Sequence, residues 1–177
     1  MKVKKISIAI IVLVFALMIT GCGKKENELV MVTEAGFAPY EYYKDGQIVG
    51  VDIDIANDIA KELGKKLVVK DVAFDSIVNE LKSGKADFAA AGMSITEERK
   101  KQVDFTIEYT TSNQVVVVRK DSALTNFSDI DGKRIAVQLG TVGDSYATEN
   151  YKNSEINRQK KFLVAAEAVK NNKADCI

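Results

Sequence analysis

The sequence predicts an α/β protein whose open sheets are flanked by helices. Two observations favour this class: β-branched runs alternate with helical patterns, and the alternation stops once and then resumes. The helices of the first alternation are expected from Asp52 to Gly64 and from Asp75 to Gly84, with the acidic residues as N-caps and the glycines as stops. Its strands are expected at 28–33, 66–72 and 86–91.

The apolar residues of these helices recur at helical spacing and are expected to face the sheet. They are Ile55, Ala56, Ile59, Ala60 and Leu63 in the first helix and Ile77, Val78 and Leu81 in the second. Ligands of open α/β sheets bind at the carboxyl ends of the strands. The loops after Thr33, Val72, Ala91 and Val137 are therefore expected to lie in one region.

An extended run at 113–120 separates the two alternations. We interpret 28–114 as a first lobe, 115–120 as the crossing between lobes, and 121–177 as a second lobe. The elements expected in the second lobe are a short helix and turn at 128–132, a strand at 134–138, a helix at 145–151, a strand at 157–162, a helix at 164–171 and the start of a strand at 174–177.

The first residues have the pattern of an export signal. Three lysines precede an uncharged run from residue 6 to residue 19, which is shorter than the roughly 20 residues of a membrane-spanning helix. Small residues then precede Cys22, as in a bacterial lipobox. We expect 1–21 to be a signal peptide, Cys22 to be lipidated and 22–27 to be a polar tether; the alternatives are an ordinary signal peptide or an anchor helix that happens to contain a cysteine.

Composition excludes several classes of chemistry. The chain has no histidine, which rules out a histidine-based triad or metal site, and its two cysteines lie far apart, so no zinc site and no disulfide framework is expected. The glycine-bearing loop at 139–143 continues into 144–145 without the lysine of a phosphate-binding P-loop. With 25 basic and 25 acidic residues there is no basic field for nucleic acid. We expect no metal, no cofactor and no nucleic-acid partner, and Cys176 should be a small buried hydrophobe.

The segment 91–105 ends a predicted strand and opens a helix that has an arginine in its first turn. Ser94 or Thr96 can cap this helix, and Glu97 would complete a capping box with Ser94. The free N–H groups and the dipole favour an anion, and Arg99 adds a planar fork that pairs bidentately with a carboxylate. The segment therefore indicates a carboxylate site, while a solvated surface helix explains the same charges equally well from physics alone.

Segment 91–105 also resembles the signature of bacterial extracellular solute-binding proteins of the polar amino-acid type, family 3, which are the receptors of ABC importers. Five further motifs match that family in order, and the resemblance covers about residues 28 to 177. They are Phe-Ala-Pro-Tyr-Glu at 37–41, Ile-Val-Gly-Val-Asp-Ile-Asp-Ile-Ala at 48–56, Phe-Asp-Ser-Ile at 74–77, Leu-Lys-Ser-Gly-Lys-Ala-Asp at 81–87 and the run from Asp131 to Thr141.

The resemblance implies a two-lobe architecture of the type II periplasmic-binding-protein kind. Members of the family continue well beyond the position that corresponds to Ile177, where this sequence ends in the beginning of a predicted strand. On this basis we expect the second lobe, and the return of the chain to the first lobe, to be incomplete.

The resemblance also implies a ligand-binding site. Arg99 would hold the α-carboxylate of an amino acid, helped by Ser94 and by the second-lobe loop that contains Thr141 and Val142. Gly92 corresponds to a position whose carbonyl accepts from the α-ammonium, and a glycine allows the backbone to approach the ligand closely.

The side chain of the ligand would meet four further residues. Phe37 and Phe74 correspond to aromatic walls, with two ordinary core phenylalanines as the alternative. Glu34 matches a position that often holds an acid facing the ligand side chain, although it could instead lie at the rim in water. Gln138 is expected to help set specificity. Together, the acid of Glu34 and the amide of Gln138 would suit a ligand with a cationic or amide side chain.

The resulting hypothesis is a lipid-anchored, monomeric receptor outside the cytoplasmic membrane, which delivers a polar or charged amino acid to an ABC permease and has no catalytic residues. Two alternatives stay open. One is an enzyme on the same fold, similar to prephenate, arogenate or cyclohexadienyl dehydratase, for which Glu34 is the obvious general acid. The other is a ligand-sensing module or a degenerate fragment.

Overall fold

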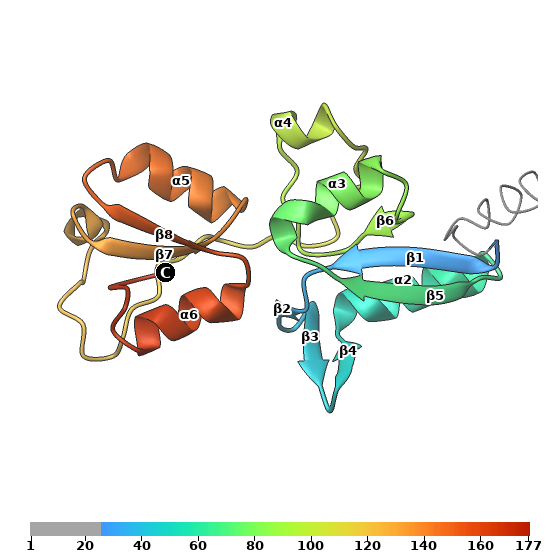
Figure 1. Cartoon of the computed structure of the whole chain (residues 1–177), viewed down its shortest axis with the longest axis horizontal. Helices are drawn as coiled ribbons and strands as arrows, with labels where there is room; N and C mark the ends of the chain where they lie inside the picture. Colours follow the sequence, from blue (N-terminus) through green and yellow to red (C-terminus); the bar gives the residue numbers. More distant parts are fainter. Residues whose placement is uncertain (1–25) are drawn as a thin grey trace, which may run out of the picture.

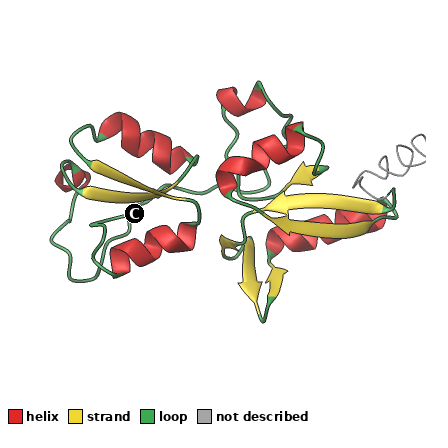
Figure 2. Ribbon diagram, viewed as in Figure 1, coloured by secondary structure: helices red, strands yellow, loops and turns green. Residues whose placement is uncertain are grey.

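The computed structural model describes residues 26–177 and shows two lobes joined by one extended segment (Figures 1 and 2). The first lobe contains β1 to β6 and the helices α2 to α4, and the second contains β7, β8, α5 and α6. The predicted signal peptide and Cys22 lie outside the described residues. In the described part of the chain, no helix has both the length and the apolar character needed to cross a membrane.

The first lobe is built on a parallel sheet with the order β5-β1-β6, as alternating strands and helices predict. β1 (Glu28–Thr33) lies in the centre and pairs along its whole length with β5 (Lys66–Asp71), while β6 is reduced to Phe88–Ala89. The helices α2 (Val51–Glu62) and α3 (Ile77–Lys82) cover opposite faces of this sheet (Figure 1).

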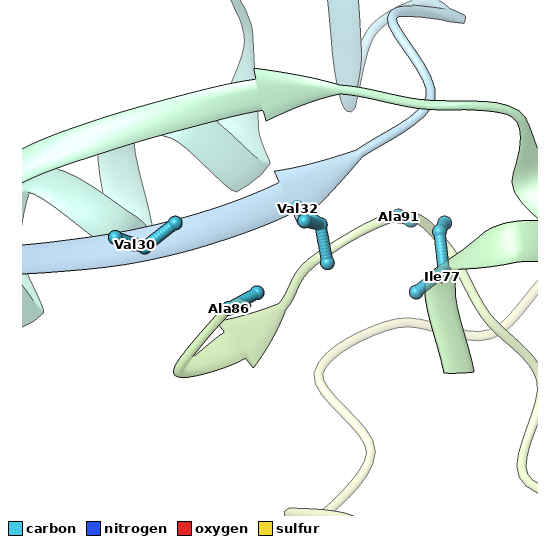
Figure 3. Close-up of a cluster of buried hydrophobic side chains, with 5 residues drawn as sticks. All are labelled: Val30, Val32, Ile77, Ala86 and Ala91. Atoms are coloured by element: carbon cyan, nitrogen blue, oxygen red, sulfur yellow. The ribbon is translucent and has the colours of Figure 1, made fainter. Parts of the chain in front are cut away.

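The alternation of side chains along β1 divides the core of this lobe into two clusters. Val30 and Val32 point to the α3 side and pack with Ile77 and two alanines (Figure 3). Met31 points to the other side and packs with Ile53 and Ala56 of α2. Because β1 is buried on both faces, its register is strongly specified and its carboxyl end is held firmly in place.

A second, antiparallel sheet precedes α2 and was not predicted from the sequence. It consists of β2 (Gly36–Phe37), β3 (Glu41–Lys44) and β4 (Gln47–Val49). The turn between β3 and β4 is Asp45-Gly46, and both residues have positive φ, which is typical of a type I′ hairpin. The Asp-Gly pair was the signal in the sequence for this hairpin.

The second lobe repeats the layered arrangement with fewer strands. β7 (Arg134–Gln138) and β8 (Glu155–Gln159) pair in parallel, after the short helix η2 (Phe127–Ile130). The helices α5 (Val142–Asn150) and α6 (Phe162–Lys170) lie on the two sides of this sheet (Figure 2). Ile135 and Val137 pack toward α5, whereas Ala136 packs against α6.

The predicted N-caps at Asp52 and Asp75 are wrong. Gly50 is the N-cap of α2, and the first N–H groups of that helix donate to the carbonyls of Pro39 and Tyr40, so the neighbouring backbone satisfies them in place of a side chain. Asp52 is instead fully buried. Asp75 lies inside the one-turn helix η1 (Phe74–Ser76), which runs directly into α3.

The predicted inward face of α2 is also partly wrong. Ala56 and Ala60 are buried as expected, but Ile55 and Ile59 are exposed, and Leu63, the C-cap, is 57% exposed. Ile53 takes the inward position instead. Both sets of residues have helical spacing, and the contact with β1 and β5 decides between them.

Several predicted boundaries shift by two or three residues. The helix expected at 145–151 begins earlier, at Val142, and the elements expected at 157–162 and 164–171 each begin two residues earlier. The runs 113–120 and 174–177 form no strand; they meet through the isolated bridge of Val118 with Cys176 and through backbone hydrogen bonds between Val117 and Ile177, while Cys176 also bridges to Ile135 of β7. Cys176 is fully buried, as predicted for a small hydrophobe.

A prediction follows from the ion pair that joins β7 to the last described residues. The backbone N–H, Nε and Nη2 of Arg134 donate to the Asp175 carboxylate at 2.9, 3.2 and 2.7 Å. These bonds lower the pKa of Asp175 to about 2, so the pair stabilises the fold above the ordinary carboxyl pKa and loses this effect as the pH falls toward 2. Asp175→Asn should lower the free energy of unfolding by about 1 kcal/mol at pH 7.

The measurement is chemical denaturation at several pH values, with Asp121→Asn as the control because Asp121 forms an ion pair while 84% exposed. The difference between wild type and Asp175→Asn should shrink between pH 4 and pH 2. A difference that stays constant over this range would contradict the ion pair as its cause.

Candidate functional site

The carboxyl ends of β1, β5, β6 and β7 meet at a cavity of about 130 Å³ between the two lobes. The arrowheads of β1 and β5 point toward the second lobe in Figure 1. All nine residues proposed from the sequence line this cavity. They are Glu34, Phe37, Phe74, Gly92, Ser94 and Arg99 from the first lobe and Gln138, Thr141 and Val142 from the second.

Sequence reasoning missed part of the lining. The additional residues are Glu41, Ala91, Ser112, Gln114 and Phe162. Ser112 and Gln114 lie at the end of the first lobe, directly before the expected crossing at 115–120. Because the chain has to pass the cleft there, their position in the sequence was a usable signal. Phe162 begins α6 and meets the ring of Phe37 edge-on, with the centroids 6.1 Å apart.

Arg99 lies in the single turn of α4 (Glu97–Lys100). Thr96 is the N-cap, and its hydroxyl accepts from the Arg99 N–H at 3.2 Å, so the predicted capping box of Ser94 with Glu97 is wrong. A helix of one turn has few aligned peptide dipoles. The attraction for an anion at this position therefore depends on the arginine side chain rather than on the helix.

The guanidinium of Arg99 joins the two lobes. Its Nη1 donates to the Ser94 carbonyl at 2.7 Å and its Nη2 donates to the Gly140 carbonyl at 2.9 Å. Its Cζ lies 5.5 Å from the centroid of the Phe74 ring, within the range of a cation–π contact. Burial lowers the pKa of Arg99 from its usual value, but the group stays charged at neutral pH.

Glu34 also lines the cavity and is only 3% exposed, so the alternative that it sits at the rim in water is wrong. Its Oε2 accepts from Gln138 Nε2 at 3.0 Å, and its Oε1 pairs with Lys161 Nζ at 3.2 Å. Both partners belong to the second lobe. The two site residues Glu34 and Gln138 therefore contact each other directly across the cleft.

Lys161 pairs with a second carboxylate, that of Asp71, at 2.6 Å. Asp71 ends β5 and lies beside Thr33 in the parallel register, and Glu34 comes directly after Thr33. The two carboxylates are therefore neighbours at one edge of the sheet, and both pair with the ammonium of Lys161. Burial lowers the pKa of Lys161, but the hydrogen bonds to Asp71 and Glu34 outweigh this effect and raise the pKa above its usual value. Sequence analysis did not identify Lys161.

Two aromatic residues and one glycine form part of the cavity wall. Phe37 is 37% exposed and stacks on Tyr40 with a centroid distance of 5.5 Å, so it is not a core phenylalanine. Phe74 is half-buried and packs partly against the core of the first lobe. Gly92 has φ 52°, and a Cβ atom there would lie 3.0 Å from the Phe37 ring, so only glycine fits without displacing that ring.

The second-lobe loop closes over Arg99. Thr141 is the N-cap of α5: its hydroxyl accepts from the Asp144 N–H at 3.2 Å and donates to the Gln138 carbonyl at 2.8 Å. A Cβ atom at Gly140 would lie 3.0 Å from Asp75 Cβ. This close approach shows that the two lobes are in contact here.

Comparison with known proteins gives consistent matches. The pattern described as bacterial extracellular solute-binding proteins, family 3, matches residues 29–177. Among curated relatives, the arginine-binding extracellular protein ArtP of Bacillus subtilis is 38% identical over 74% of this chain and 54% of its own length. A probable histidine-binding protein of Campylobacter jejuni is 37% identical over 82% of this chain and 57% of its own length. The chain thus spans little more than half the length of these two relatives.

Among solved structures, the arginine-bound form of a truncated ArgBP from T. maritima superposes with a TM-score of 0.80. It is 39% identical, and the alignment covers 85% of this chain and 72% of that chain.

The contact of Lys161 with Glu34 generates a prediction about stability. Lys161→Met leaves a buried carboxylate without its cation and should lower the free energy of unfolding by about 1 to 2 kcal/mol, less than for a fully buried pair because Lys161 is 38% exposed. Lys160→Met is the matched control, since Lys160 is exposed and its side chain makes no ion pair among the described residues. Equal denaturation midpoints for the two variants would contradict a stabilising role of the pair.

Proposed function

The chain belongs to family 3 of the bacterial extracellular solute-binding proteins, and we propose that it is the receptor of an ABC importer and captures a polar or charged amino acid between its lobes. The two lobes have the type II periplasmic-binding-protein architecture. The observation that carries the proposal is that one cavity is lined both by the guanidinium of Arg99 and by the buried carboxylate of Glu34. This arrangement suits a zwitterion with an additional polar group.

Arg99 is proposed to hold the α-carboxylate. A guanidinium has five N–H donors, and the contacts to Ser94 and Gly140 occupy two of them, so donors remain for a ligand. The carbonyl of Gly92 is proposed to accept from the α-ammonium. Phe37 and Phe74 line the same cavity and offer apolar surface to a ligand.

The side-chain end of the cavity supports a cationic or amide ligand. Glu34 and Asp71 supply two negative charges against the single positive charge of Lys161, so the group retains one excess negative charge. Gln138 adds an amide beside Glu34. The curated relatives named above are arginine-binding and histidine-binding proteins, which favours a cationic side chain as the first candidate.

Closure of the lobes is the proposed mechanical step. We assign residues 28–114 to the first lobe, 115–120 to the crossing and 121–177 to the second lobe. The contacts of Arg99 with Gly140, and of Lys161 with Glu34 and Asp71, all cross between lobes and therefore support the closed arrangement. A closed receptor that presents both lobes to a permease would deliver the ligand when the lobes part.

The enzyme alternative receives less support from the site. Glu34, the candidate general acid of a dehydratase, is engaged in an ion pair with Lys161, and this arrangement disfavours a proton donor. The relatives named above are binding proteins. Stoichiometric binding without turnover would distinguish the receptor from the enzyme.

The central test is Arg99→Ala with calorimetric titration of arginine and histidine. Removal of one partner of a buried charge pair costs about 2 to 5 kcal/mol, so affinity should fall by a factor of roughly 30 to several thousand. Lys101→Ala is the control, because Lys101 is exposed at the end of the same helix. If Arg99→Ala binds as tightly as the control, the carboxylate is held elsewhere.

A second test concerns the proposed anchor. We propose that residues 1–21 form the signal peptide, 22–27 the tether, and that Cys22 carries the lipid, which holds the receptor outside the cytoplasmic membrane. Cys22→Ala should lose the mass of the lipid and be released from membranes, because two acyl chains anchor a protein firmly whereas the polar tether alone does not. Mass spectrometry and membrane fractionation measure this. An unmodified, freely released wild type would refute the anchor.

A further inference from the structure

Two buried acidic side chains, Glu41 and Asp52, form no ion pair among the described residues. Glu41 of β3 is 1% exposed, and Asp52 in the first turn of α2 is fully buried. Glu41 Oε2 and Asp52 Oδ1 have no hydrogen-bond partner among the described residues. A proton shared by the two carboxyl groups would supply a hydrogen bond to these atoms.

The groups around the pair keep that proton in place. The Tyr109 hydroxyl donates to Asp52 Oδ2 at 3.1 Å, and Glu34 adds its negative charge from the end of β1. Burial, followed by the hydrogen bond and the charge of Asp52, raises the pKa of Glu41 to about 10. Without a cation beside it, Glu41 is therefore a neutral acid at pH 7. Two basic groups near the cavity have other partners: Lys161 pairs with Glu34 and Asp71, and Arg99 donates to two carbonyls.

Glu41 nevertheless has access to a ligand. It lines the same cavity as Glu34, and it pairs across the hairpin with Phe37, one of the walls of that cavity. A cationic side chain that reaches Glu34 therefore passes close to Glu41. A positive charge within about 4 to 6 Å of a carboxyl group lowers its pKa by roughly 1 to 3 units, because it stabilises the ionised form.

We propose that Glu41 is a further specificity-determining residue, and that a cationic amino-acid side chain releases the proton shared by Glu41 and Asp52 when it binds. The inference rests on the proposed function. In this step the O–H bond of the shared proton breaks, the proton passes to the buffer, and the ligand keeps its own charge. The pair then carries two negative charges, one of which faces the bound cation. A neutral side chain of the same shape leaves the proton in place.

The experiment compares arginine with citrulline by calorimetry at pH 8, in buffers that differ in ionisation enthalpy. The two ligands share the α-ammonium and the α-carboxylate, so the difference in protons released reports the side chain alone. We expect arginine to release measurably more protons per molecule bound than citrulline. We also expect the affinity for arginine, relative to citrulline, to rise between pH 6 and pH 8.

The variant Glu41→Gln provides a second test, because an amide can donate a hydrogen bond to Asp52 but has no acidic proton to release. This variant should bind arginine at least tenfold more weakly and citrulline unchanged, and the excess proton release should disappear. The control is Glu108→Gln, at an exposed position outside the cavity.

The outcomes separate the two proposals. Equal proton release for both ligands in the wild type overturns this inference and leaves the receptor function standing, and it needs no variant to fold. Unchanged arginine affinity in Glu41→Gln overturns it as well. Absence of binding for arginine, citrulline and histidine alike overturns both proposals.

Discussion

Lys161 holds the ends of two neighbouring strands against the second lobe. Glu34 follows β1 and Asp71 ends β5, and the parallel register brings these acids to the same edge of the sheet. Two adjacent carboxylates repel each other unless a cation lies between them, and Lys161 supplies it with contacts of 3.2 and 2.6 Å. Lys161 is the N-cap of α6 in the second lobe. The neutralisation of the two carboxylates in the first lobe therefore depends on the position of the second lobe.

The cavity consequently contains polar groups of opposite charge. The guanidinium of Arg99 donates to two carbonyls from different lobes, so its positive charge is oriented but not neutralised. Around Glu34, two acids face a single lysine. A ligand with a carboxylate and a polar or positive group complements both, and the half-exposed Phe37 ring, which also lines the cavity, supplies apolar contact.

The acid pair of Glu41 and Asp52 links this cavity to the structure of the first lobe. Tyr109 donates to Asp52 and accepts from the Gly92 N–H, so one hydroxyl connects the start of α2, the segment that leaves the first lobe, and the loop above Arg99. A change in the protonation of Glu41 would affect these hydrogen bonds of Tyr109. The backbone caps on α2 serve the same arrangement, since they free Asp52 from capping and allow it to face inward.

The sequence by itself determined the alternation of elements and the positions of β1 and β7, because hydrophobic periodicity is a local property of the chain. The nine residues that line the cavity were implied by the resemblance of its motifs to a known family. It did not determine which face of α2 is buried, since Ile53 and Ile55 both satisfy a helical period and only the contact with the sheet distinguishes them. The hairpin at 41–49 was missed because its strands are short.

Only the tertiary structure decided that Glu34 is buried, that Lys161 pairs with it, and that Glu41 and Asp52 are buried without a hydrogen-bond partner for one oxygen of each among the described residues. Each of these depends on residues far apart in the chain, 127 positions in the case of Glu34 and Lys161. The energy of a charge depends on burial and on its neighbours, and neither can be read from a residue type and its spacing.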